Sequence, residues 1–406
     1  MSRRTGDEPH SLSRRAFLGA TAALPLGDLL LQQQTALAND KDGETESPLN
    51  SGLVLRQKQP ENLEFPFHSL DSFITSNERF YVRNHYPVPP VDLKTWKLKV
   101  DGSVDKPSEF SLEEILKLDS RTMTATLECA GNSRGFLVPK ENGVLWELGA
   151  VSNAKWKGVS LADVLDRAGV SKNAVDVVLV GADSGPVADP KSPGPINFAR
   201  SIPIEKVKKH EALLAYEMNG DPLSAAHGFP LRAIVAGWYG MASIKWLSRI
   251  VVTDKAFDGF FQSLEYSYFV RKNGLPSVVP ITEMQVKASI ARPTLYEVIP
   301  SGTKYRMHGA AWAGESSIAK VEVSTDGGKT WKEAKLLGEP VPFAWRLWEY
   351  AWDVPTTKGR VTCMARATDS KSRIQPMERD PDRRNYMISH VLPIEVNIHP
   401  TPSQNR

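Results

Sequence analysis

The spacing of apolar residues divides the chain into a mixed half and a strand-rich half. Residues 96–100 alternate between apolar and polar positions, which predicts a half-buried strand. Residues 111–117 and 159–169 each place apolar residues at helical spacing after a capping serine. Residues 175–180 form a nearly continuous apolar run, which is typical of a buried strand. This mixture predicts an α+β domain over residues 61–256.

The second half contains strand-like runs and turn signals without a convincing helical repeat. Residues 318–323 and 344–352 are such runs, and an Asp-Gly-Gly turn occupies residues 326–328. The pattern predicts an all-β sandwich over residues 281–398. Residues 257–280 are marked by proline and glycine and are predicted to connect the two domains.

The N-terminal 38 residues have the three parts of an export signal. A twin-arginine pattern at residues 13–18 precedes a moderately apolar stretch over residues 16–31, and residues 35–38 (Thr-Ala-Leu-Ala) offer a cleavage site. The apolar stretch is too short and too polar for a membrane span, so we expect no membrane anchor. We expect twin-arginine export to the periplasm, removal of residues 1–38, and a polar linker over residues 39–60.

Composition narrows the classes of function. The chain has 406 residues, 41% hydrophobic and 24% charged, as expected for a globular protein of two domains. Its net charge of +3 and the absence of basic runs give no reason to expect a nucleic-acid partner. No Cys-x-x-Cys-His motif for covalently attached haem occurs, so we expect no haem in this chain.

The chain has only two cysteines, and Cys129 carries the strongest chemical signal. It lies in a loop of small residues with Arg134 five positions on, and a thiolate ligand needs positive surroundings to stay ionised. Alone, the pattern also fits a buried structural cysteine. Cys363 lies in a strand-like run and is predicted to be a core residue, although a Cys129–Cys363 disulfide stays open on counting alone.

Several segments together resemble the sulfite oxidase family of molybdenum enzymes, which includes bacterial sulfite dehydrogenases and the catalytic subunits of sulfane dehydrogenases. The matching segments, in family order, are residues 80–89, 126–135, 146–156, 227–232, 243–246 and 324–331. The resemblance covers residues of about 60 to 398. It implies a mixed α+β molybdopterin-binding domain followed by an immunoglobulin-like β-sandwich that mediates dimer formation.

The resemblance also implies a cofactor site that holds molybdenum-molybdopterin. Cys129 occupies the position of the metal ligand. The residues that match the family's cofactor contacts are Val82, Arg83, Asn84, His85, Tyr86, Asp183, His227, Arg232, Ser243, Ile244 and Lys245. Among them, Arg232 and Lys245 are the expected partners of the cofactor's phosphate, which needs charge-assisted donors.

The implied substrate is a small sulfur oxyanion, which convergent guanidinium groups bind well. Arg83, Arg134 and Arg346 match the family's anion-pocket arginines, and Trp146 matches a tryptophan beside them. Arg346 equally fits a strand arginine stacked between two tryptophans. The family's active-site tyrosine aligns near Gly274, and we predict that Tyr268, or alternatively Tyr266, takes its place.

The implied reaction is the oxidation of sulfite to sulfate by oxygen-atom transfer, with electrons passed to an external cytochrome c. We expect a homodimer. Two alternatives stay open: the catalytic subunit of a sulfane dehydrogenase, which acts on carrier-bound sulfur, and a non-catalytic exported scaffold. Ala242 stands where many relatives have an arginine, which makes the anion pocket less positive.

Overall fold

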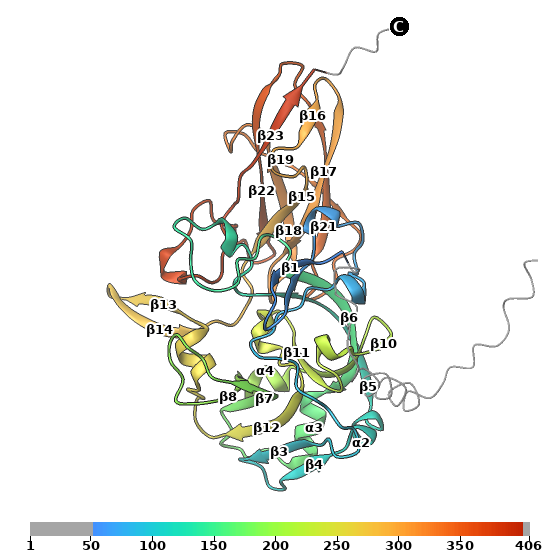
Figure 1. The fold of residues 1–406 in the computed structure, drawn as a ribbon, viewed down its shortest axis with the longest axis vertical. Helices are drawn as coiled ribbons and strands as arrows, with labels where there is room; N and C mark the ends of the chain where they lie inside the picture. The colour runs from blue at the N-terminus through green and yellow to red at the C-terminus, as the bar shows by residue number, and fades with distance from the viewer. Residues whose placement is uncertain (1–51, 401–406) are drawn as a thin grey trace, which may run out of the picture. The chain divides into compact units, whose positions relative to one another are not determined.

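The computed structural model describes residues 52–400, and Figure 1 shows their arrangement. The export signal predicted over residues 1–38 lies outside the described residues. The polar linker predicted over residues 39–60 falls partly within them, and there residues Val54–Gln57 form strand β1, paired with β2 (Asn62–Glu64).

The first half is built on two five-stranded sheets. In one, β5 (Ser120–Glu128) pairs with β6 (Val151–Ser160), and β6 pairs with β9 (Ala212–Met218). Strand β9 also pairs with β10 (Asp221–Pro222) and β11 (Arg232–Val235). The other has the order β4 (Ser108–Phe110), β3 (Leu98–Gly102), β12 (Leu247–Thr253), β7 (Asp176–Gly185) and β8 (Ile196–Pro203). Strand β12 runs parallel to β3, whereas the other pairings are antiparallel.

Three short α-helices accompany these sheets, so the α+β prediction for this half is confirmed with more sheet than expected. Helix α2 (Leu112–Leu116) begins with a capping box in which Ser111 and Glu114 exchange hydrogen bonds. Helix α3 (Leu161–Ala168) ends at Gly169, which has a positive φ of 70° and whose N–H donates to Leu165 O and Asp166 O. Helix α4 (Ile204–Lys208) follows β8.

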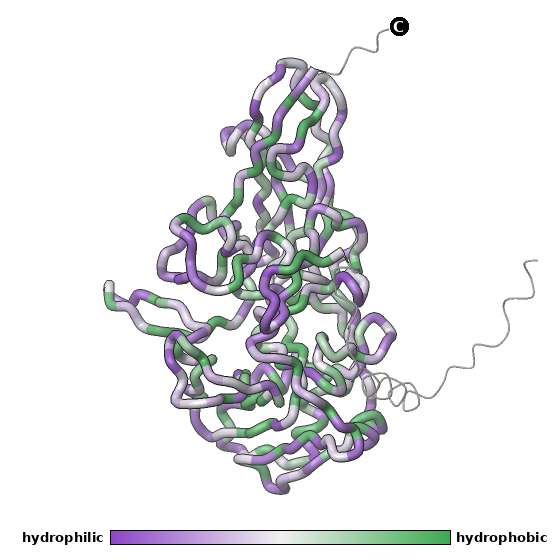
Figure 2. The backbone as a smooth tube through the Cα atoms, viewed as in Figure 1, coloured by the Kyte–Doolittle hydropathy of each residue, from purple (hydrophilic) through white to green (hydrophobic). Residues whose placement is uncertain are grey.

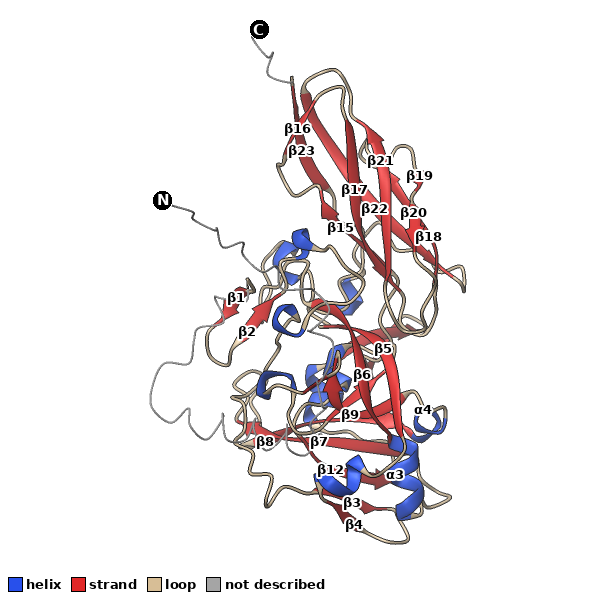
Figure 3. Ribbon diagram, turned by 90° about the vertical axis from the view of Figure 1, so that its right-hand side faces the viewer, coloured by secondary structure: helices blue, strands red, loops and turns tan. Residues whose placement is uncertain are grey.

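Residues 287–399 form two packed sheets, seen clearly in Figure 3. One has the order β15 (Lys287–Arg292), β17 (Lys304–Trp312), β21 (Arg346–Asp353) and β20 (Lys335–Leu337). The other has the order β16 (Val298–Pro300), β23 (Ile394–His399), β22 (Gly359–Asp369), β18 (Ile318–Ser324) and β19 (Lys332–Glu333). Apolar side chains of both sheets form one buried core between them. In Figure 2 the strands of this half carry hydrophobic stretches, coloured green, between hydrophilic ones.

This sheet pair matches the predicted β-sandwich, and its immunoglobulin-like character stays a prediction. Cys363 is buried in the sandwich core, as predicted. Both cysteines are free, so no disulfide joins Cys363 to Cys129.

The segment predicted to connect the halves is more ordered than its composition indicated. Residues Phe261–Glu265 form a π-helical turn, η7, and a two-stranded hairpin follows, made of β13 (Ser267–Lys272) and β14 (Leu275–Pro280). Figure 1 shows this hairpin extending away from the neighbouring sheets. A backbone hydrogen bond also joins the two halves directly: the Thr126 N–H on β5 donates to Phe343 O at 3.0 Å.

Candidate functional site

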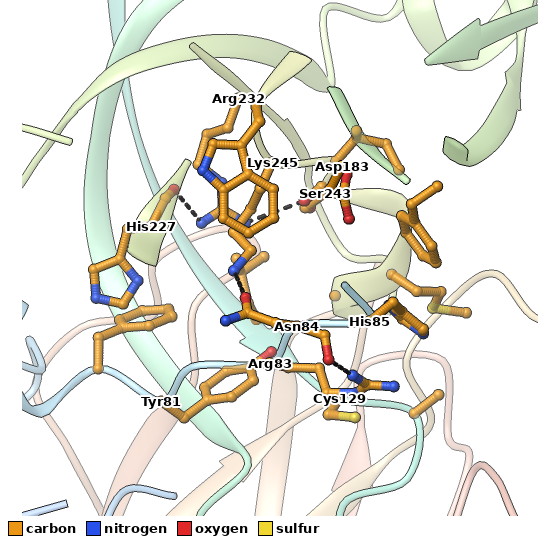
Figure 4. Close-up of a pocket in the computed structure, with 18 of the residues that line it drawn as sticks. Tyr81, Arg83, Asn84, His85, Cys129, Asp183, His227, Arg232, Ser243 and Lys245 are labelled. Carbon is orange, nitrogen blue, oxygen red and sulfur yellow. Dashed lines mark hydrogen bonds between the residues drawn. The ribbon is translucent and has the colours of Figure 1, made fainter. Parts of the chain in front are cut away.

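The predicted cofactor residues converge on a pocket of the first half, here called the inner pocket (Figure 4). Its wall is formed by Phe80, Tyr81, Arg83, Asn84, His85, Leu127, Cys129, Ala130, Asp183, Phe198, His227, Arg232, Gly240, Met241, Ser243, Ile244, Lys245, Trp246 and Tyr266. These side chains come mainly from strand ends and the loops beside them. Nine of the eleven predicted cofactor residues therefore lie together, although they are scattered over more than 160 positions of the sequence.

Two cations at one end of the inner pocket are held by backbone carbonyls. Arg232 opens β11 and donates to His227 O at 2.9 Å and to Ser243 O at 3.1 Å. Its Nε is buried and has no hydrogen-bond partner within residues 52–400. Lys245 donates to Ala226 O at 2.8 Å and also to the Asn84 side chain. Donors that are buried but only partly satisfied are suited to receiving an anionic group.

The electrostatics of this pocket are those of buried, crowded cations. Burial, reinforced by Arg232, holds the pKa of Lys245 well below its ordinary value. Burial together with Lys245 and Arg232 lowers the pKa of His227 to about 3, so this imidazole is neutral near pH 7. Burial raises the pKa of Asp183 to about 6 despite the opposing charge of Lys245. An anion bound here would relieve the repulsion among the cations.

Cys129 lies immediately after β5 and is one of five residues that line both of two neighbouring pockets. Its N–H donates to Ala150 O at 2.9 Å, and its C=O accepts from Asn132 N at 2.9 Å, so the loop is closed on both sides. The thiol lines the inner pocket together with Arg83, which Figure 4 shows beside it. It also lines a second pocket, here called the outer pocket. A thiolate ligand at this position would face both.

The outer pocket contains one residue of the second half. Its wall is formed by Gln57, Pro60, Arg83, Asn84, His85, Tyr86, Cys129, Arg134, Gly143, Val144, Pro186, Val187, Ala188, Asp189, Phe261, Glu265, Tyr266 and Tyr386. Tyr386, from the loop between β22 and β23, was not predicted. Its hydroxyl donates to the Glu265 carboxylate. The sequence distance from Tyr386 to Cys129 explains why periodicity and motif spacing gave no sign of it.

Arg134 is fixed in the outer pocket by contacts on several sides. Its Nε donates to Asn385 O at 3.0 Å, one terminal nitrogen donates to Val144 O at 3.2 Å, and its guanidinium carbon lies 4.9 Å from the Tyr386 ring centroid. Gly143 has a φ of 103°, which favours glycine, and a Cβ there would lie 2.6 Å from the Arg134 guanidinium. Arg134 is thus oriented before any ligand binds.

Tyr266, and not Tyr268, is the tyrosine that reaches the pockets. Its hydroxyl lies 2.6 Å from His85 Nε2, and the His85 ring stacks on Phe198 at 4.2 Å. Tyr268 lies two residues further on in the hairpin and packs against Arg383 instead, with 4.4 Å between guanidinium carbon and ring centroid. Within one strand, residues two apart would face the same side, but Tyr266 precedes β13 and caps the π-helical turn, so the two tyrosines need not face the same way.

Arg346 lies outside both pockets, contrary to its predicted place among the anion-binding arginines. It begins β21 and donates to Gly338 O at 2.6 Å within the second half. The sequence run around Arg346 is therefore a strand of the sandwich, and the Arg346 guanidinium forms a hydrogen bond to the segment that precedes this strand.

Two other predicted residues support the site without lining it. Trp146 is fully buried and accepts a hydrogen bond at its C=O from Gly135 N at 2.8 Å, which holds the loop that carries Arg134. Val82 is buried and exchanges backbone hydrogen bonds of 2.9 Å with Leu63. Tyr86 lines the outer pocket rather than the inner one.

The residues present fit a phosphorylated pterin with a metal. The buried Nε of Arg232, the partly satisfied Lys245 and the neutral His227 provide donors for a phosphate and for polar ring edges. The Cys129 thiol supplies a soft ligand at the opposite end. Within residues 52–400, no three His, Cys, Asp or Glu side chains converge on a common metal site. In the same residues no helix is both long and apolar enough to cross a bilayer.

Comparison with family models finds two matching domains in the predicted order. Residues 85–261 match the oxidoreductase molybdopterin binding domain, and residues 278–387 match the Mo-co oxidoreductase dimerisation domain. Together these matches span more than half of the chain.

Comparison with individual proteins finds relatives that agree with these two family models. The chain is 35% identical to chicken sulfite oxidase over 352 residues, covering 81% of this chain and 74% of the relative. It is 35% identical to human mitochondrial sulfite oxidase and covers 61% of that longer protein. It is 33% identical to sulfite oxidase of Arabidopsis thaliana, covering 90% of it.

Among solved structures, the sulfane dehydrogenase SoxCD from Paracoccus pantotrophus has a similar fold. The TM-score is 0.73 at 24% identity, and the match covers 97% of this chain and 96% of that chain. The two matched domains and the identity to the relatives have one consequence: this chain belongs to the sulfite oxidase family of molybdopterin-binding oxidoreductases.

Proposed function

We propose that this protein oxidises sulfite to sulfate with a molybdenum-molybdopterin cofactor. The observation that carries the proposal is the position of Cys129, whose thiol lines both the basic inner pocket and the arginine-containing outer pocket. A metal bound to this sulfur could be held by a cofactor on one side and meet an anion on the other. The non-catalytic scaffold loses its support, since the chain belongs to a family of oxidoreductases.

The inner pocket would hold the cofactor through Arg232 and Lys245 at the phosphate, with Asn84, Ser243 and His227 near its polar edges. When bound, the cofactor supplies the two-electron redox chemistry and the transferable oxygen. The protein contributes charge-assisted donors that are already oriented, so little reorganisation accompanies binding.

Substrate binding falls to the outer pocket. Arg83 and Arg134 present guanidinium groups next to Cys129, and planar donor pairs match the oxygens of an oxyanion. Burial alone would lower the pKa of Arg83, but neighbouring Tyr266 and Cys129 leave it raised, so Arg83 stays charged. The Tyr266 hydroxyl, held by His85, would orient one substrate oxygen.

The overall conversion consumes one water and releases two protons and two electrons for each sulfite oxidised. An external acceptor must remove those electrons, and we propose a cytochrome c. The predicted twin-arginine signal supports a periplasmic location, and the match to a dimerisation domain supports a homodimer.

Steady-state kinetics of the molybdenum-loaded protein test the proposal. Cytochrome c reduction that saturates with free sulfite, with sulfate as the product, is the expected result. Absence of sulfite turnover in protein shown to contain molybdenum and pterin would contradict it. Apparent mass in solution, measured by light scattering, tests the dimer separately.

A second candidate is oxidation of sulfane sulfur on a carrier, and one observation favours it. With Arg346 elsewhere, the outer pocket offers Arg83 and Arg134 together with Tyr266, Tyr386 and Glu265. This wall is less positive than three arginines would make it. If a persulfide on a carrier peptide is oxidised and free sulfite is not, the second candidate replaces the first.

A further inference from the structure

Beneath the Cys129 loop lies a buried ion pair between the two halves of the protein. Lys287 Nζ, at the start of β15, lies 3.0 Å from Glu128 Oε1, at the end of β5. Both side chains are only 2% exposed. A buried pair survives only where hydrogen bonds satisfy its remaining donors and acceptors, so its other contacts indicate what it holds.

The remaining contacts lead into the metal-ligand loop. Lys287 also donates to Ser133 Oγ at 3.0 Å, and Glu128 accepts from Asn132 Nδ2 at 3.1 Å. Trp312 Nε1 on β17 donates to the second Glu128 oxygen at 2.8 Å. Residues on both sides of Cys129 are thus joined to two strands of the second half.

Ser133 has a conformation that needs such support. Its φ is 78°, in the left-handed region that non-glycine residues rarely adopt. The turn at Ser133 allows Arg134 N to donate back to Gly131 O at 3.0 Å, which directs the arginine toward the outer pocket. Lys287 thus bonds the side chain of Ser133, the residue with positive φ that directly precedes Arg134.

We infer that Lys287 is a positioning residue that sets the Cys129 sulfur and the Arg134 guanidinium relative to each other through Glu128 and Ser133. The inference rests on the proposed function for the roles of Cys129 and Arg134. It assigns to the second half a part in the active site beyond assembly of a dimer.

A second buried lysine provides a matched control. Lys206 on α4 is 6% exposed and lies 2.6 Å from Glu315 Oε1 of the second half. That carboxylate also accepts from Trp238 Nε1 at 2.8 Å. Like the Lys287 cluster, this one joins a buried lysine, a carboxylate and a tryptophan indole, although the Glu315 side chain is 30% exposed. Lys206 also pairs with Glu211 at 2.9 Å, so its hydrogen bonds run to Glu211 and Glu315 and not to the Cys129 loop.

The test compares the double variant Glu128→Gln/Lys287→Met, which leaves no unpaired charge, with Lys206→Met, Lys287→Arg and the parent. We expect the double variant to shift the absorption and EPR signals of the thiolate-bound metal and to raise the KM for sulfite about tenfold. In cofactor-free protein, we expect Cys129 alkylation by iodoacetamide to change in rate. Lys287→Arg should restore part of each signal.

The outcomes separate this inference from the proposed function. Parental spectra, alkylation rate and KM in the double variant would overturn the inference. Equal changes in Lys206→Met would overturn it too, because any loosening between the halves would then suffice. If the protein does not oxidise sulfite at all, the spectra and the alkylation rate still decide whether Lys287 positions the loop.

Discussion

The inner and outer pockets share Cys129 but are built differently. The wall of the inner pocket comes entirely from residues 80–266, in the first half and the start of the connecting segment. The outer pocket adds Tyr386 from the second half, and Asn385 fixes the Arg134 guanidinium there. This difference means that substitutions in the second half can alter the proposed substrate pocket without changing the residues that line the proposed cofactor pocket.

The largest expected effect comes from Cys129, the proposed metal ligand. Cys129→Ser removes the soft ligand, and we expect turnover to fall by at least about two orders of magnitude, with altered metal spectra. Cys363→Ser is the matched control, because this cysteine is equally free but lies in the sandwich core. Metal analysis and sulfite assays of both variants check the prediction. Retained spectra and turnover in Cys129→Ser would refute the assignment of the ligand.

Arg134→Gln should damage the outer pocket alone. Loss of one charge-assisted contact costs about 1.5–3 kcal/mol, so kcat/KM for sulfite should fall roughly 10- to 100-fold, mainly through KM. Molybdenum and pterin content should stay at the parental level. Arg346→Gln serves as the control and should leave KM unchanged, since that side chain bonds Gly338 O instead. A raised KM in Arg346→Gln would place this arginine back in the site.

Asp183→Asn sharpens the description of the inner pocket through pH. Burial raises the pKa of Asp183 to about 6, so the folded protein holds this proton more tightly than the unfolded chain does. The parent should therefore lose stability as pH rises from about 4 to 6, by at most about 3 kcal/mol, and the variant should lack this loss. Urea unfolding of cofactor-free protein between pH 4 and 7 measures the difference. A difference that stays constant over this range would contradict the prediction.

Tyr266→Phe should have the smallest effect. It removes one hydroxyl that pairs with His85, worth about 1 kcal/mol, so we expect kcat to fall roughly fivefold with the fold intact. Tyr268→Phe should leave kcat unchanged because that ring packs on Arg383. Pre-steady-state reduction by sulfite compares the two variants, and the reverse order of effects would restore Tyr268 as the active tyrosine.

The local parts of this site could be predicted from sequence because they depend on short motifs. Cys129 and Lys245 lie in the segments 126–135 and 243–246, whose resemblance to the family's motifs identified them. Tyr266 and Tyr268 could not be separated, since a π-helical turn changes the direction of side chains just before the hairpin.

Contacts made over long sequence distances were beyond prediction. Tyr386 and Lys287 reach the Cys129 loop only through packing of one half on the other, and no periodicity in the sequence encodes that packing. Glu128 carried a usable signal, because a carboxylate at the end of a buried strand needs a buried partner. Arg346 was misassigned since a strand arginine and a pocket arginine can occur in the same sequence run.

One side chain forms hydrogen bonds to the backbone at both ends of the hairpin of β13 and β14. Arg200 on β8 is fully buried and donates to Tyr266 O at 3.4 Å and to Ile281 O at 2.6 Å. Arg200 therefore fixes Tyr266 and Ile281 at the two ends of the hairpin. Counting residues across the hairpin placed the family's tyrosine near Gly274. We expect contact with Arg200 to identify this tyrosine better than a residue count does.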